Sequence, residues 1–188
     1  AYDTIDWLVN NVTDNNGNTK TCTATVTIED NHGPTITCPG TMQNPLPLVL
    51  DANCTLALPD YEGDLLNVTD NCAYTVSQAP AIGAQLSGLH VGLNVVTMTA
   101  TDPGGLFAQC DIFIDVQDNT PPDAQCKNLT VALNGDGDAT ISPAQVNNGS
   151  TDACGIASLA VNQTAFDCNY VGGNTVTLTV TDVNGNAS

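Results

Sequence analysis

The chain has 188 residues and a formal net charge of −18, because 20 acidic side chains face only two basic ones. Proteins bind nucleic acids and anionic lipid surfaces through clustered Lys and Arg, so this charge excludes a nucleic-acid partner and weighs against docking on an anionic membrane. No apolar run approaches the roughly 20 residues that cross a bilayer, which predicts no membrane insertion.

Residues 1–30 are predicted to hold the last two strands of a repeat unit, at Ile5–Val12 and Thr21–Ile28. β-Branched residues stand on both sides of a turn that contains glycine, as in a hairpin. A lone hairpin is only marginally stable in water. These strands therefore need a partner, either the next unit or another chain.

Residues 31–118 are predicted to form a complete unit. Early strands at Leu46–Leu50 and Thr55–Leu58 flank a turn at 51–53, and a hairpin over 94–116 closes the unit. Strands at intervals of about 8 to 12 residues, without a helical period, indicate a β-sandwich of immunoglobulin type.

Residues 119–188 are predicted to begin a second unit that lacks its last strand. Cys110 lies 88 positions after Cys22, and Cys126 lies 88 positions after Cys38, which sets the repeat period. The pattern would place the next last-strand cysteine at position 190, beyond Ser188. The predicted fold class is all-β, with tandem immunoglobulin-like β-sandwiches whose terminal units are incomplete.

Cysteine content indicates the compartment. The chain contains eight cysteines and two histidines, and no Cys-x-x-Cys motif occurs. This pattern favours disulfides over zinc, and disulfides persist in oxidising compartments. We therefore expect a secreted or cell-surface, extracellular protein.

Three spaced motifs recur along the chain. They are a Pro-x-x-x-Cys opening at Pro34 and Pro122, an Asp-Asn-Cys or Asp-Ala-Cys block at 70–72 and 152–154, and a Thr-Ala-Thr-Asp hairpin that reaches a cysteine, at 99–110. Together they resemble the hyalin repeat (HYR) domain, as found in tandem arrays of bacterial surface proteins. The resemblance implies an immunoglobulin-like sandwich associated with extracellular adhesion and without enzymatic activity.

The resemblance also implies one disulfide, because in that family the opening cysteine pairs with the cysteine of the last strand. Carried over to this chain, Cys38 pairs with Cys110. With that bond in place, the natural further pairs join cysteines that are near in sequence. These pairs are Cys54–Cys72 and Cys154–Cys168.

Cys22 and Cys126 then remain as complementary halves of a missing bridge. One hypothesis is that Thr21–Ile28 of one chain inserts as the last strand of a neighbour's second unit, with an interchain disulfide between Cys22 and Cys126. Repetition of this head-to-tail contact between copies of the chain would give a fibre. The alternative is a segment of a longer array, in which both cysteines bond to flanking repeats of the same polypeptide.

A binding module that presents loops to a carbohydrate or protein ligand is a hypothesis from a different class. Exposed aromatic side chains would favour it, because sugars stack on them. The candidates are few and scattered: Trp7, Tyr61, Tyr74 and Tyr170.

Calcium is the one cofactor that the sequence suggests. Glu29, Asp30 and Asp118 gather acids between the units, where an ion would stiffen an array. The alternating oxygen donors at 134–138 resemble the start of a calcium loop, but the later positions of that motif do not match. A hairpin turn is the better interpretation there.

No catalytic residue is predicted. His32 and His90 lie in no recognisable nucleophile motif, and no acid stands in an apolar run that would raise its pKa for acid catalysis. We therefore expect a protein that is not an enzyme.

Overall fold

The structure is a computed structural model that describes residues 4–63 and 66–188, with 4–12, 21–24 and 89 described by their backbone alone. Within these ranges the regular structure is strand, apart from a short helix, α1 (Pro143–Val146), and two 3-10 turns, Gly88–His90 and Cys168–Tyr170. The predicted all-β class is confirmed. No helix in the described ranges is long and apolar enough to span a membrane.

The chain divides into two compact units, which are described separately. The first unit comprises residues 1–39, 60–82 and 96–112, and the second comprises 40–59, 83–95 and 113–188. The predicted units at 1–30, 31–118 and 119–188 are a division by sequence repeat and stay a prediction. Below, the complete repeat denotes 31–118 and the second repeat denotes 119–188.

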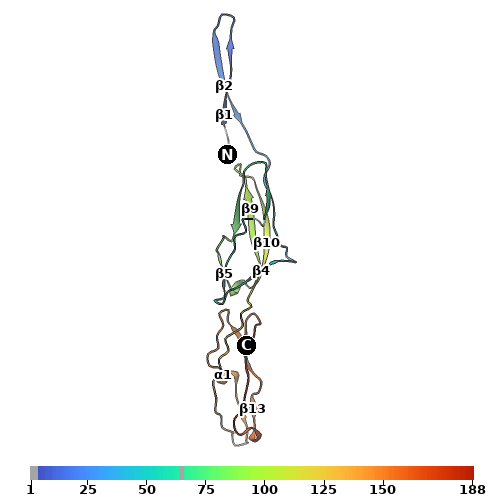
Figure 1. The fold of residues 1–188 in the computed structure, drawn as a ribbon, viewed down its shortest axis with the longest axis vertical. Helices are drawn as coiled ribbons and strands as arrows, with labels where there is room; N and C mark the ends of the chain where they lie inside the picture. The colour runs from blue at the N-terminus through green and yellow to red at the C-terminus, as the bar shows by residue number, and fades with distance from the viewer. Residues whose placement is uncertain (1–3, 64–65) are drawn as a thin grey trace. The chain divides into compact units, whose positions relative to one another are not determined.

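Three antiparallel strand pairs involve the first unit. They are β1 (Thr4–Thr13) with β2 (Thr19–Thr27), β3 (Thr35–Thr37) with β6 (Asn67–Thr69), and β7 (Thr75–Ala79) with β9 (Gly92–Thr101). The strands β1 and β2 lie on the two N-terminal stretches that the sequence predicts as strands, and they pair with each other in a hairpin (Figure 1).

The largest sheet has four strands in the order β4, β10, β9 and β7, with β4 at Leu46–Val49 and β10 at Phe107–Gln117 (Figure 1). Strand β10 is therefore central, and it pairs in parallel with β4, where Ile114 lies opposite Leu46. Alternate side chains of a strand point to the same face. In β10 those of Ile112, Ile114 and Val116 are at most 1% exposed, so the last strand of the complete repeat supplies much of the apolar core.

Three antiparallel pairs lie in the second unit. They are β5 (Thr55–Ala57) with β8 (Gln85–Ser87), β11 (Ala139–Thr140) with β13 (Ala165–Phe166), and β12 (Ile156–Val161) with β14 (Leu178–Asp182). Val146, Leu178 and Val180 are buried there. Residues 129–133, which correspond in sequence to β4, form no strand.

Five tight turns share one geometry. In each, the backbone N–H of the first residue donates to the carbonyl of the fifth at 2.8–3.0 Å, and the side-chain Oδ1 of the first residue accepts the backbone N–H of the fifth. The first residues are Asp14, Asp51, Asp102, Asn134 and Asp182. The fourth residue has a positive φ between 62° and 97° in every turn, which is why it is glycine in all of them except at Cys54. A type I turn followed by a left-handed residue is a common short hairpin connection.

Gly105→Ala is expected to lower the free energy of unfolding by about 1–2 kcal/mol, because a Cβ is unfavourable in the left-handed region. Gly105 has a φ of 91° and open space around its Cα, so the loss would come from backbone strain without a clash. Urea unfolding measures the change. Gly135→Ala is the matched control, since Gly135 also faces open space but has no positive φ; equal losses in the two variants would contradict the turn geometry.

Candidate metal centres and an open groove

Among the residues that the structure describes, acidic side chains meet in two clusters. The first acidic cluster is Asp30, Asp70 and Asp102, in the first unit; the second is Asp118, Asp152 and Cys154, in the second unit. Within each cluster, one potential ligand atom per residue lies within 4.8 Å of the others. Both clusters are built from residues far apart in the sequence, so only folding brings them together.

Strand ends position the first acidic cluster. Asp70 directly follows β6 and Asp102 directly follows β9, while Asp30 lies shortly after β2 in the segment that leads to β3. Each carboxylate uses its Oδ1 atom to accept nearby N–H groups. The donors are His32 N at 3.0 Å and Asn71 Nδ2 at 3.2 Å for Asp30, Asn71 N at 2.9 Å for Asp70, and Leu106 N at 2.9 Å for Asp102.

The second carboxylate oxygen of each residue in this cluster has no hydrogen-bond donor among the described residues. The Oδ2 atoms of Asp30, Asp70 and Asp102 are buried and accept no hydrogen bond from the described residues. Asp102 is only 5% exposed as a whole. Each residue of the cluster therefore keeps one buried carboxylate oxygen that has no donor among the described residues.

The Cys72 thiol lies beside the first acidic cluster. Hydrogen bonding to Asp30, with smaller contributions from burial and from the charges of Asp30, Asp70 and Asp102, raises the pKa of Cys72. The same thiol contact, followed by the backbone N–H of His32, lowers the pKa of Asp30. The carboxylate is thus held ionised and the thiol protonated.

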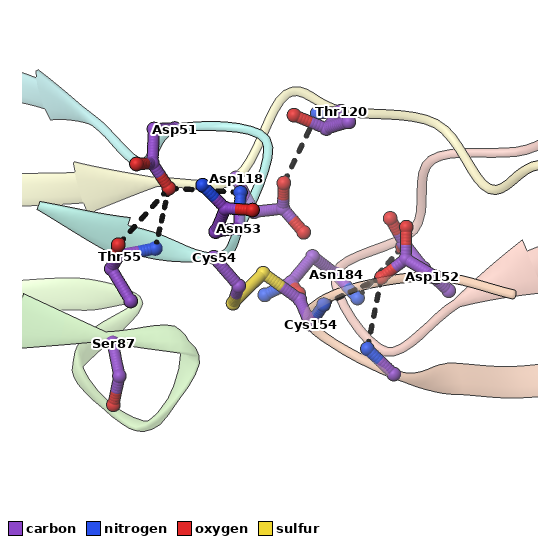
Figure 2. The surroundings of a disulfide bond; sticks show 12 residues. Asp51, Asn53, Cys54, Thr55, Ser87, Asp118, Thr120, Asp152, Cys154 and Asn184 are labelled. Carbon is purple, nitrogen blue, oxygen red and sulfur yellow. Dashed lines mark hydrogen bonds between the residues drawn. A yellow bond between two sulfur atoms is a disulfide. The ribbon is translucent and has the colours of Figure 1, made fainter.

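The second acidic cluster surrounds a disulfide (Figure 2). Asp118 directly follows β10 and accepts the N–H of Thr120 at 3.0 Å; Asp152 accepts the N–H of Cys154 at 2.8 Å. The Oδ2 atom of Asp118 and the Oδ1 atom of the nearby Asn184 are buried without a hydrogen-bond partner among the described residues. This cluster offers two carboxylates and an amide oxygen, since the Cys154 sulfur is bonded.

One amide distinguishes Asp182, which takes the place of Asp102 in the corresponding turn of the second repeat, from Asp102 itself. Burial raises the pKa of Asp182, but hydrogen bonds from the side chain and backbone of Asn186 and from the Asn184 and Gly185 N–H groups outweigh it, so the pKa of Asp182 lies below its ordinary value. Asn186 Nδ2 donates to Asp182 Oδ2 at 2.8 Å. The corresponding turn has Leu106 in place of Asn186, which leaves Asp102 Oδ2 without that donor.

The structure places only some of the predicted calcium ligands in the two clusters. Asp30 and Asp118 lie in the two clusters, but Glu29 is exposed and lies in neither. The sequence interpretation missed Asp70, Asp102 and Asp152. The signal that could have found Asp70 and Asp152 was available, because both open the repeated Asp-x-Cys block.

Oxygen-bearing side chains alternate in several stretches that the sequence predicts as turns. The first side chain of each stretch accepts hydrogen bonds within its own turn. Asn134 Oδ1 accepts the N–H groups of Asp136 and Asp138 at 3.0 and 2.9 Å. The side chain and then the backbone N–H of Asn18 lower the pKa of Asp14 in the same way, and the backbone N–H groups of Thr55 and Asn53 lower that of Asp51. The side-chain oxygen at the first position of each set thus closes a turn, as the turn interpretation predicts.

The disulfides differ in part from the sequence interpretation. Cys38 is bonded to Cys110, the pair implied by the resemblance. Cys54 is bonded to Cys154, so the predicted Cys54–Cys72 and Cys154–Cys168 pairs are wrong in this structure. Cys54 lies in the second unit and Cys72 in the first. Gly88 makes room for the bond, because a Cβ there would lie 2.7 Å from the Cys54 sulfur.

Three cysteines have free thiols among the residues whose side chains are described: Cys72, Cys126 and Cys168. The Cys168 sulfur lies 3.7 Å from the Gly137 carbonyl oxygen, in a loop. The side chain of Cys22 lies outside the described residues, so the Cys22–Cys126 bond stays a prediction.

An open groove of about 830 Å³ lies in the second repeat. Residues 127–131 and Leu133 line one part of it and residues 171–176 another, with Cys126 on its wall. Apolar side chains there are exposed: Leu129 by 40%, Val131 by 41% and Val171 by 77%. The second repeat thus leaves apolar surface uncovered along this groove.

The aromatic candidates do not gather at a ligand site. Tyr61 is 4% exposed, and burial raises its pKa. Tyr74 and Tyr170 are 44% and 43% exposed and belong to different units, and the Trp7 side chain lies outside the described residues. His90 Nδ1 accepts the N–H of Ser87 at 3.1 Å, a structural contact.

Among known proteins, no family model matches this chain and no curated protein sequence matches it.

Proposed function

We propose that the chain is an extracellular structural or adhesive protein, built from tandem immunoglobulin-like repeats of the hyalin-repeat type, that polymerises head to tail by strand exchange. The observation that carries the proposal is the open groove of the second repeat. The all-β fold and the two disulfides support the architecture and the oxidising location.

The groove corresponds in position to strand β10 of the complete repeat. Residues 129–133 correspond to residues 46–50, which contain β4, since each stretch ends one residue before the first residue of a shared turn, Asn134 or Asp51. Residues 172–181 correspond to β9, and the Asn174 side chain repeats the contacts of Asn94 with two carbonyls of the preceding turn. In the complete repeat, β10 lies between β4 and β9. The second repeat has the groove between the corresponding segments.

The stretch Thr21–Ile28, most of which lies in β2, has the sequence of a strand that fills such a groove. Val26 and Ile28 stand 88 positions before Ile114 and Val116, which are at most 1% exposed. In this chain Val26 is 43% exposed and Ile28 is 56% exposed. Insertion into the groove of a neighbour would cover these side chains and the apolar groove together, and burial of apolar surface favours association.

The cysteines support the same alignment of Thr21–Ile28 with β10, at a spacing of 88 residues. Cys22 corresponds to Cys110 and Cys126 corresponds to Cys38, each at a spacing of 88 residues, and Cys38 and Cys110 are bonded in the complete repeat. A β2 strand placed in the groove as β10 is placed in its own sheet would bring Cys22 to Cys126. The disulfide would then make a head-to-tail contact permanent under oxidising conditions.

The first test is a gel of the native protein after blocking of free thiols, run with and without reductant. The expected result is a ladder in steps of one chain, 19.4 kDa, that collapses on reduction and is lost in Cys22→Ser. Cys72→Ser is the matched control and should keep the ladder, because Cys72 is free and lies outside the groove. A single band of one chain, with Cys22 and Cys126 both blocked, would reject the covalent fibre and favour repeats that pair with flanking repeats of one polypeptide.

A further inference from the structure

We propose that the first acidic cluster binds one calcium ion, which fixes the segment between β2 and β3 to the turn regions that follow β6 and β9. The inference is independent of strand exchange, because it concerns residues of the first unit alone. It is carried by buried oxygen atoms that accept no hydrogen bond from the part of the chain that the structure describes.

The spacing of the cluster suits one ion. Potential ligand oxygens of Asp30, Asp70 and Asp102 all lie within 4.8 Å of one another. Calcium binds carboxylate oxygens at about 2.3–2.6 Å, so a central ion reaches oxygens up to about 5 Å apart. Backbone carbonyls and water complete such sites in proteins.

The burial of the oxygens is the independent sign of a ligand. Asp102 is 95% buried, being 5% exposed, and its Oδ2 atom accepts no hydrogen bond from the described residues. The Oδ2 atoms of Asp30 and Asp70 are also buried and also accept no hydrogen bond from the described residues. Buried charges without partners are costly, and neighbouring carboxylates repel each other. A divalent cation would remove both costs, and the chain has only two basic side chains to offer instead.

A similar cluster of acidic side chains, with a buried oxygen that has no partner among the described residues, recurs in the second unit, which supports a functional role for the first cluster. Asp118 stands 88 positions after Asp30, and Asp152 opens the block that repeats the one at Asp70. Asp118 is 7% exposed and its Oδ2 atom again has no partner among the described residues. The second acidic cluster has two carboxylates where the first has three, because its third member, Cys154, is in a disulfide, so the first is the stronger site.

The donor set selects the class of ion. Three carboxylates are hard oxygen ligands, which calcium prefers, whereas zinc favours His and Cys ligands in a closed tetrahedron. Magnesium demands a near-ideal octahedron and keeps several of its waters. Calcium tolerates the irregular geometry that three turn and loop carboxylates provide.

The test follows backbone amide resonances of the full 188-residue chain during a calcium titration at constant ionic strength. The reporters are the N–H groups of His32, Asn71 and Leu106, each of which donates to one carboxylate of the cluster. We expect all three to shift together with one dissociation constant, of the order of 10⁻⁴–10⁻³ M as in extracellular modules. The N–H groups of Asn53 and Thr55, which donate to Asp51, should not follow them.

Asp102→Asn is the decisive variant, and we expect it to weaken calcium binding at least tenfold. Asparagine can close this turn, because Asn134 does so in the turn of the same geometry. Asp51→Asn is the matched control: it removes the same charge from another such turn and should leave the affinity unchanged.

Three outcomes would overturn the proposal. The first is no shift of the reporters at about 10 mM calcium, well above the expected dissociation constant. The second is equal affinity in Asp102→Asn and the unaltered chain. The third is a shift that includes the Asn53 and Thr55 amides and is reproduced by magnesium, which would indicate general screening of an acidic surface.

Discussion

Replacing Cys38 and Cys110 together by alanine is expected to lower the free energy of unfolding by about 4 kcal/mol, because the bond closes a long loop in the unfolded chain. The two cysteines are 72 residues apart in sequence. They join the opening of the complete repeat to β10, one of the two inner strands of its sheet. Urea unfolding of the double variant under oxidising conditions measures the loss.

The control for this prediction also tests the corrected pairing. Cys72→Ala removes a free, exposed thiol and should change the free energy of unfolding by no more than about 0.5 kcal/mol. Cys154→Ala breaks a bond that spans 100 residues and should cost several kcal/mol. A large loss in Cys72→Ala together with a small loss in Cys154→Ala would restore the Cys54–Cys72 pair.

Ile114→Ala is expected to lower the free energy of unfolding by about 2–5 kcal/mol, the range for an aliphatic side chain removed from a packed core. Ile114 is 1% exposed and lies in β10 opposite Leu46 of β4. Truncation therefore leaves a cavity at the centre of the four-stranded sheet. Thermal or urea unfolding of the variant measures the loss.

Ile28→Ala makes the identical chemical change on a side chain that is 56% exposed, so in the single chain it should cost within about 0.5 kcal/mol. In the proposed polymer, Ile28 would take the buried place that Val116 has in the complete repeat. On the non-reducing gel, the Ile28→Ala variant should then give a ladder with fewer steps than the unaltered protein gives. Equal destabilisation of the single chain by both variants would contradict the central position of β10.

The local structure of this protein could be predicted from its sequence. The turns at Asp14, Asp51, Asp102, Asn134 and Asp182 form because a side-chain oxygen at the first position accepts an N–H only four residues later, while the fourth position takes a positive φ. Strand β10 forms because its apolar residues alternate. Interactions that close within five residues depend little on the rest of the chain, so the all-β class followed from them.

Longer connections depended on the tertiary structure. The residues next to Cys54 do not indicate whether its disulfide partner is Cys72 or Cys154. The division of the fold into two units does, because Cys54 and Cys154 lie in the second unit and Cys72 lies in the first. Asp30 could be suspected as a metal ligand because acids gather between the repeats. Its companions Asp70 and Asp102 stand 40 and 72 residues away in the chain, and only the packing of β6 and β9 brings their buried oxygens together.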